Sequence, residues 1–213
     1  MFNKSLITNK DNSSLTIYTI GHSNREAEEF IQILCHYRIK LVVDVRSQPF
    51  SKYCPQFNKD IIQQTLIHSG IEYLFLGKEL GARPEYKDYY VNNKVSFNKL
   101  RSSESFKKGI FRLFDEAKNK NIVIMCSEKE PINCHRSILI SKVLEEEGAE
   151  VKHIINKAEI LNRFSFEEKL LEKFKIQKTL FDTESTRKTN IEDAYKKQEQ
   201  IISYQEEIQE VTV

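Results

Sequence analysis

Five short apolar runs recur along the chain, and polar or amphipathic stretches separate them. Each run is rich in Val, Ile, Leu and Phe, which is typical of strands buried on both faces of a sheet. The runs lie at residues 15–20, 40–45, 71–76, 121–126 and 150–155. Their short length and flanking turn residues favour strands over helices.

The stretches between the runs repeat apolar residues at helical spacing. Phe30, Ile33 and Leu34 form one apolar stripe, and Ser23 with Glu26 predicts a capping box at the start of that helix. Further helices are predicted at residues 58–70, 106–117 and 138–148. Strands that alternate with helices need crossover connections, so the pattern predicts a mostly parallel sheet of about five strands covered on both faces.

The pattern therefore indicates an α/β fold, a three-layer sandwich, over residues 15–156. From residue 157 onwards charges of mixed sign dominate and strand patterns are scarce, so we expect a helical C-terminal extension over residues 157–213. Its segment 191–208 has helical spacing, and the Ile and Tyr residues of this segment favour packing on the main domain.

The charge balance limits the classes of partner. The chain has 33 Lys and Arg against 31 Asp and Glu, and a net charge of only +2 gives no general attraction to nucleic acid. Any anion site must therefore be local. The four cysteines do not resemble a disulfide framework, and the sequence predicts neither a membrane span nor a signal peptide. We expect a cytoplasmic protein with free thiols and no membrane partner; the sequence does not indicate an oligomeric state.

Polar clusters follow four of the five predicted strands. In an open parallel sheet, ligands bind beyond the carboxyl ends of the strands. The clusters contain His22, Ser23 and Arg25 after the first strand, Asp44, Arg46 and Ser47 after the second, Arg83 in the long loop after the third, and Cys126, Glu128, Cys134, His135 and Arg136 after the fourth. Because these strand ends share one edge of the sheet, the clusters predict one shared site.

Two kinds of chemistry are represented in these clusters. The candidates for proton or nucleophile chemistry are Cys126, Glu128, Cys134, His135, His22 and Asp44. The candidates for binding an anionic substrate are Arg46, Ser47, Arg136, Arg25 and Arg83. Structural roles remain open, because Asp44 and Arg46 can form a salt bridge and Cys126 can be a core residue at a strand end.

The loop after the fourth strand contains the most reactive residue types. A helix N-terminus and Arg136 would both stabilise a thiolate, so Cys134 is a candidate nucleophile and His135 a candidate base. Glu128 is a candidate general acid or base, whereas Glu130 is expected to face water. The residues expected to line one pocket are His22, Arg46, Glu128 and Cys134.

A metal site is the weaker alternative for this loop. The available ligands are Cys126, Cys134 and His135, with Cys54, His22 or Glu128 as a fourth. Their spacing matches no familiar zinc knuckle, so the sequence leads us to expect no metal and no cofactor.

Five motifs in a fixed order carry a family resemblance. They are "TIGHSN", "LVVDVRSQP", "PQFNK", "GIEYLFLGKELGARP" and "IVIMCSEKEPINCHR", followed by "GAEVKHI". Over roughly residues 16–155 the chain resembles the domain-of-unknown-function 488 family. The resemblance implies an α/β sandwich with active-site residues in these loops, but no established reaction. The positions that match the family's signature are His22, Asp44, Arg46, Cys126, Glu128, Cys134, His135 and Arg136. The chain departs from the family at Ala82, where a second glycine is usual.

A weaker resemblance, to rhodanese-like domains, lies in "VVDVRS" and in the later "IVIMC" with its Arg-Ser helix start. In those domains the thiol begins a short loop, whereas the loop from Cys126 to Arg136 is longer and contains Pro131 and a second cysteine. We expect an enzyme, a hydrolase or transferase, acting on a small anionic substrate such as a nucleotide, a nucleobase or a nucleic-acid end. The alternatives are a non-catalytic phosphate or nucleic-acid binding module and rhodanese-like sulfur transfer.

Overall fold

The computed structural model of the chain describes residues 14–176 and 183–206. The polar start of the chain, where the sequence predicts no signal peptide, lies outside the described residues. Across the described part, each helix is too short or too polar to cross a membrane.

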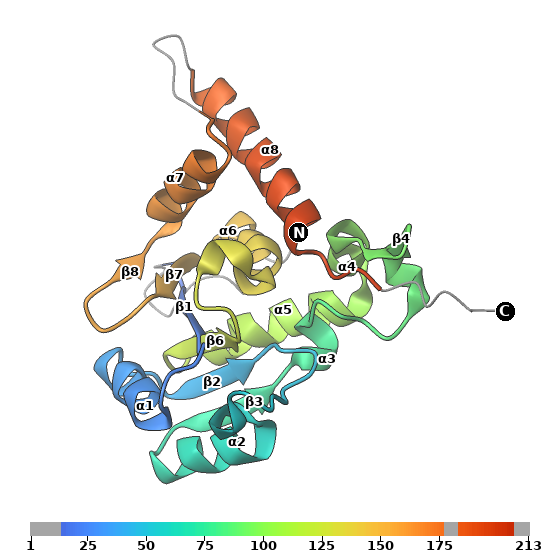
Figure 1. Ribbon diagram of the computed structural model, residues 1–213. Coiled ribbons are helices and arrows are strands. Elements are labelled where there is room, and N and C mark those ends of the chain that lie inside the picture. Colours follow the sequence, from blue (N-terminus) through green and yellow to red (C-terminus); the bar gives the residue numbers. More distant parts are fainter. Residues whose placement is uncertain (1–13, 177–182, 207–213) are drawn as a thin grey trace, which may run out of the picture.

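Within the described residues, a central sheet is built from six strands. They are β1 (Thr16–Gly21), β2 (Leu41–Asp44), β3 (Glu72–Phe75), β6 (Ile122–Cys126), β7 (Glu150–Ile154) and β8 (Ile160–Leu161). Their order is β3-β2-β6-β1-β7-β8, and all neighbours pair in parallel except β7 and β8. Because β6 lies between β1 and β2, the carboxyl ends of three strands meet at the centre of one edge (Figure 1).

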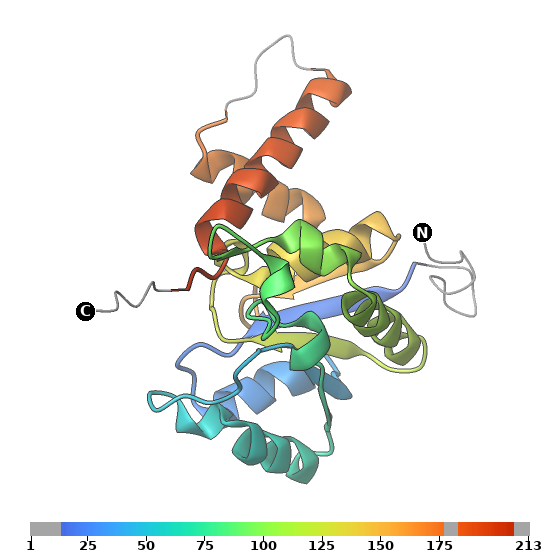
Figure 2. The ribbon, with the colours of Figure 1, turned by 90° about the vertical axis from the view of Figure 1, so that its right-hand side faces the viewer.

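Helices cover both faces of this sheet. The longer ones of the main domain are α1 (Ala27–His36), α2 (Lys59–His68), α5 (Glu104–Ala117), and η5 (Arg136–Ser141), a π-helix that continues directly into α6 (Lys142–Glu146). Figure 2 shows α1 and α2 on one side of the strands and α5 and α6 on the other. Alternate residues of a strand face the two helical layers: Val42 packs with α1 and α2, whereas Val43 packs with α5.

The predicted fold class is confirmed: the protein is an α/β sandwich with a mostly parallel sheet, and all five predicted strands are present. The antiparallel β8 is an addition. The long stretch after β3 also contains short elements. These are α3 (Gly77–Leu80), η3 (Lys87–Tyr89), the hairpin of β4 (Tyr90–Val91) and β5 (Lys94–Val95), and α4 (Phe97–Ser102).

The predicted capping box at Ser23 is wrong. The helix begins at Ala27, its N-cap residue is Glu26, and this cap makes no side-chain hydrogen bond. Ser23 instead has a φ of 53° and lies in a turn, where its hydroxyl bonds the side chain of Asn24 at 3.2 Å. The chain needs this turn to leave the end of β1, and the turn places Ser23 too early to cap the helix.

The described part of the C-terminal extension contains two helices, α7 (Arg163–Lys173) and α8 (Glu184–Ile202), and the short strand β8 that pairs with β7. As expected, an aromatic residue docks α8 on the main domain: Tyr195 is buried, and Nζ of Lys142 in α6 lies 5.1 Å from the centre of its ring. Gln198 is also buried and donates to the carbonyl of Ile132 at 2.6 Å. Because Ile132 belongs to the loop after β6, the extension braces that loop.

Candidate functional site

The loops after β1, β2 and β6 meet at the centre of the sheet edge. The chain leaves β1 and β2 towards helices on one face, and leaves β6 towards the helix on the other face. Such a divergence of neighbouring connections opens room at the strand ends, where open α/β sheets bind ligands. The residues that the structure brings together here are His22, Asp44, Arg46, Cys126, Glu128, Cys134, His135 and Arg136.

A glycine allows the first and last of these loops to approach. A Cβ atom on Gly21 would lie 1.8 Å from the carbonyl oxygen of Glu128, far inside contact distance. The backbone N–H of His22 donates to Cys126 O at 2.9 Å, and that of Ser23 donates to Ser127 O at 2.9 Å. The extended pairing therefore continues one step beyond the strands and fixes the loop after β6 against that after β1.

Asp44 and Arg46 form a buried ion pair. Oδ1 of Asp44 accepts from Nε of Arg46 at 2.9 Å, and Oδ2 accepts from the NH2 nitrogen at 2.6 Å. The hydroxyl of Tyr73 also donates to Oδ2, at 2.8 Å. The remaining terminal nitrogen of Arg46 lies 3.1 Å from Nε2 of His22, whose ring stacks on that of Phe57 at 4.2 Å. The guanidinium is thus largely engaged by the protein.

His22 is held neutral in this network. Burial and the positive charge of Arg46 lower the pKa of His22 to about 4. Its Nδ1 lies 2.8 Å from the carbonyl oxygen of Ser23, which can only accept, so Nδ1 carries the hydrogen. Nε2 is then the acceptor that faces Arg46. Burial and the neighbouring Asp44 carboxylate likewise raise the pKa of Tyr73, which stays protonated.

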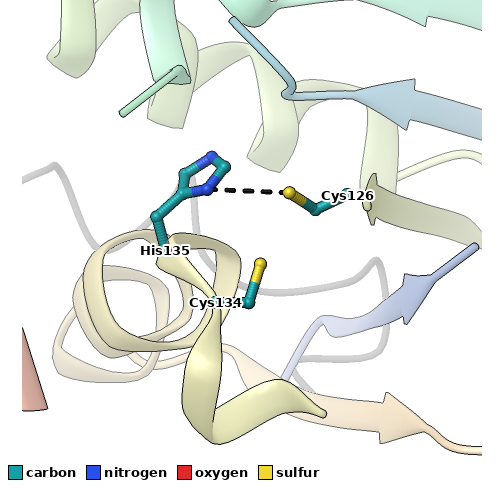
Figure 3. Close-up of side chains that lie close together, drawn as sticks. All are labelled: Cys126, Cys134 and His135. Carbon is teal, nitrogen blue, oxygen red and sulfur yellow. Dashed lines mark hydrogen bonds between the residues drawn. The ribbon is translucent and has the colours of Figure 1, made fainter. Parts of the chain in front are cut away.

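The second group is a thiol cluster, defined as Cys126, Cys134, Glu128 and His135. Both thiols lie 3.0 Å from Oε2 of Glu128, and Sγ of Cys126 lies 3.6 Å from Nδ1 of His135 (Figure 3). Cys126 ends β6, whereas Cys134 and His135 follow the single turn η4 (Pro131–Asn133) and precede η5. Cys126 is 3% exposed and Cys134 is 1% exposed, whereas Glu128 as a whole residue is exposed.

Burial and mutual contact shift the pKa values of this cluster. The bond with Cys134, together with burial, raises the pKa of the Cys126 thiol. Burial also acts to raise the pKa of Cys134, but the contact with Cys126 and the charge of Arg136 outweigh it and lower that pKa. Burial and Cys134 raise the pKa of Glu128. In His135 the effect of burial is outweighed by Cys134 and Glu128, which raise its pKa.

Arg136 brings a positive charge to the thiol cluster. The side chain is fully buried, and its two terminal nitrogens donate to the carbonyl oxygens of Glu128 at 2.6 Å and Lys129 at 3.1 Å. Among the described residues, its Nε has no hydrogen-bond partner and no carboxylate forms an ion pair with it. The guanidinium therefore shapes the loop through its backbone and leaves a positive charge beside the sulfurs.

Three predicted binding residues lie outside this central set. Arg25 donates to the carbonyl oxygens of Gly21 and Ile155 and lines a cavity of about 530 Å³ on the β7 side. Ser47 and Arg83 line a separate cavity of about 310 Å³ near α3, where the hydroxyl of Ser47 accepts from the backbone N–H of Arg83 at 2.9 Å. These two cavities are not lined by His22, Arg46, Glu128 or Cys134. A single pocket lined by those four residues therefore remains a prediction.

Sequence patterns did not identify two contributors to the site. Tyr73 reaches Asp44 only because β2 and β3 pair in the register Val42 to Tyr73, which no local pattern encodes. The backbone carbonyl oxygen of Val45 accepts a hydrogen bond from Nε2 of His135 at 3.2 Å, and this bond orients the ring. A backbone acceptor has no residue-specific sequence mark.

Comparison with known proteins gives one family. The model of a family described as "Domain of unknown function DUF488" matches residues 26–143, which is more than half of the chain. The match includes the thiol cluster and the Asp44–Arg46 pair, whereas His22 and Arg25 precede it. No curated protein and no solved structure matches the chain.

Proposed function

We propose that this chain, which belongs to the family "Domain of unknown function DUF488", is an enzyme acting on a small anionic substrate at the carboxyl ends of β1, β2 and β6. The substrate class is a nucleotide, a nucleobase or a nucleic-acid end, and the reaction is a hydrolysis or a group transfer. The proposal includes a cytoplasmic location, which the four free cysteines support.

The observation that carries the proposal is the position of Glu128. One carboxylate oxygen lies 3.0 Å from both thiols, and burial raises the pKa of this carboxyl group although the residue as a whole is exposed, so the group lies where the buried cluster meets the surface. A carboxylate in this position can exchange a proton between a bound substrate and the cluster. Arg136, whose guanidinium has no carboxylate partner among the described residues, adds a positive charge that favours an anion.

Glu128→Gln tests this role, with Glu130→Gln as the matched control in the same loop. We expect the first variant to fold normally and to lose about 10²- to 10⁴-fold in turnover, the usual contribution of a general acid or base. The second should keep its turnover within about twofold, because Glu130 is exposed and has no role in the cluster. Nucleoside phosphates, free bases and end-labelled oligonucleotides would be incubated with the full chain, and mass spectrometry would identify products.

The second candidate is a non-catalytic phosphate or nucleic-acid binding module. The near-complete burial of Cys126 and Cys134 favours it, because inert thiols need no access to a substrate. Binding of a member of that panel without any product would support this candidate and contradict the enzyme. Rhodanese-like sulfur transfer is the weakest alternative, since a persulfide needs a thiol that a second substrate can reach, and both candidate sulfurs are covered.

A further inference from the structure

Three side chains of the thiol cluster direct potential metal ligands at one point. The sulfurs of Cys126 and Cys134 and a ring nitrogen of His135 all lie within 4.8 Å of one another, and the sulfur of Cys126 is 3.6 Å from Nδ1 of His135 (Figure 3). In a tetrahedral zinc site, bonds of about 2.3 Å to sulfur and 2.0 Å to nitrogen place those two atoms roughly 3.5 Å apart. The distance between Cys126 and His135 is therefore the one that a single zinc ion spans, and the other two separations, which are within 4.8 Å, would shorten as the ion binds.

The orientation of His135 is a second, independent observation. Its Nε2 lies 3.2 Å from the carbonyl oxygen of Val45, which can only accept a hydrogen bond. Nε2 must therefore carry a hydrogen, and Nδ1, which faces the sulfurs, is the nitrogen available for a metal. Histidines that bind metals almost always donate their other ring N–H to a carboxylate or backbone carbonyl in this way.

The charge of the surroundings is compatible with a divalent cation. Arg136 is fully buried and forms no ion pair with a carboxylate among the described residues. Two thiolates neutralise one divalent cation, so the negative charge of the Glu128 carboxylate still offsets the guanidinium when the ion is bound.

We propose that Cys126, Cys134 and His135 bind one zinc ion and leave its fourth coordination position open. On binding, the protons of the two thiols pass to solvent as the zinc–sulfur bonds form. Two thiolates and an imidazole suit zinc, whereas magnesium and calcium require oxygen ligands. The proposal goes beyond the proposed function, because zinc can bind here whether or not the protein catalyses a reaction.

The ligand spacing explains why the sequence motif is unfamiliar. Cys126 comes from the end of a sheet strand, while Cys134 and His135 are consecutive residues just before η5. Zinc knuckles, in contrast, place pairs of ligands on a single tight turn. Here the fold brings the ligands together, with Gly21 and Arg136 holding the loop in place.

The full chain, purified under reducing conditions and stripped with a chelator, would be titrated with cobalt(II) and then with zinc. We expect one metal ion per chain, thiolate-to-cobalt charge-transfer absorption, and loss of that absorption when zinc displaces cobalt. Cys126→Ser and Cys134→Ser should each abolish the absorption. The double variant Cys35→Ser with Cys54→Ser should keep it, because these cysteines lie outside the cluster.

Circular dichroism would establish whether each serine variant folds. If one does not, the melting temperature of the unmodified chain decides instead: zinc should raise it and magnesium should leave it unchanged. The proposal is overturned if the reduced full chain binds neither cobalt nor zinc, or if Cys134→Ser binds as the unmodified chain does. These measurements need no substrate, so they separate failure of the metal site from failure of the proposed function.

Discussion

At the scale of single residues, many buried polar groups of the site have their partners within the protein, although Nε of Arg136 has none among the described residues. Arg46 illustrates this: a guanidinium predicted to bind a substrate is held by Asp44 and His22. A buried pair of this kind contributes little net stability when intact, because both charges lose their hydration. Removing one partner is different, since the other charge is then left uncompensated.

We expect Asp44→Asn to lower the free energy of unfolding by about 3–5 kcal/mol, the usual effect of breaking a buried ion pair. Glu29→Gln is the matched control, because Glu29 is also the carboxylate partner of an arginine, at 3.5 Å from Arg25, but is 55% exposed. It should change stability by less than about 1 kcal/mol. Urea denaturation measures the free energy of unfolding of both variants. Equal losses in the two would contradict the cost expected for an uncompensated buried charge.

At the scale of elements, the site depends on how closely two loops approach. At Gly21, the end of β1 and the loop after β6 approach so closely that a methyl group does not fit between them. The π-helix η5 begins immediately after the thiol cluster, and such helices are frequent at functional sites. Backbone spacing, rather than any single side chain, thus sets the geometry of the cluster.

Gly21→Ala should force the loops apart, since its Cβ would lie 1.8 Å from the carbonyl oxygen of Glu128. We expect a loss of about 1–3 kcal/mol in stability, typical of overpacking, together with weaker cobalt binding. Gly70→Ala is the comparison: Gly70 has a φ of +70° but nothing within 4 Å of the added atom. It should lose about 1 kcal/mol through backbone strain and bind cobalt normally. Intact cobalt affinity in Gly21→Ala would show that the close approach is dispensable.

The positions of strands were more predictable from sequence than the contacts between them. The run 122–126 is apolar throughout, which is typical of a strand buried on both faces, and the rule for parallel sheets placed Cys126 and Asp44 at one edge. Side-chain direction was not predictable. Arg83 follows a neighbouring strand but turns towards Tyr204, 4.8 Å from its ring, because the short elements after β3 carry it away.

At the scale of the whole molecule, the C-terminal helices complete the core as well as bracing the loop after β6. Phe166, Leu170, Ala194 and Tyr195 are all buried in the same apolar cluster as α5 and the strands. On this side, Glu145 of α6 lies 3.8 Å from Arg163 of α7, with its side chain only 5% exposed. The extension therefore buries a carboxylate that the main domain alone would leave closer to water.

Burial raises the pKa of Glu145 from 4.5 to about 7. The unfolded chain titrates near the usual value, so the folded protein keeps a proton between these pH values that the unfolded chain has lost. The stability contributed by this group is present at low pH and is lost as the pH rises from about 4.5 to 7. Glu145→Gln should abolish this pH-dependent loss of stability. The free energy of unfolding should therefore rise by about 1–3 kcal/mol at pH 8 and change little at pH 4.

Thermal unfolding of Glu145→Gln across this pH range would measure the effect. Glu146→Gln is the control, because Glu146 is the next residue and its side chain, which pairs with Lys142, is 49% exposed. Its stability curve should run parallel to that of the unmodified protein. If Glu145→Gln also runs parallel, the carboxyl of Glu145 titrates normally in the folded state.

The order of strands also affects how the protein can be made. During synthesis β1 and β2 emerge first, yet they are not neighbours in the finished sheet, because β6 separates them. Until residue 126 has left the ribosome, the early strands lack the partner that joins them, and their apolar edges remain open to wrong pairing. Pairing of β6 therefore joins β1 to β2 and places Cys126 beside them in one late step. Before that step, no part of the thiol cluster is in position in the nascent chain.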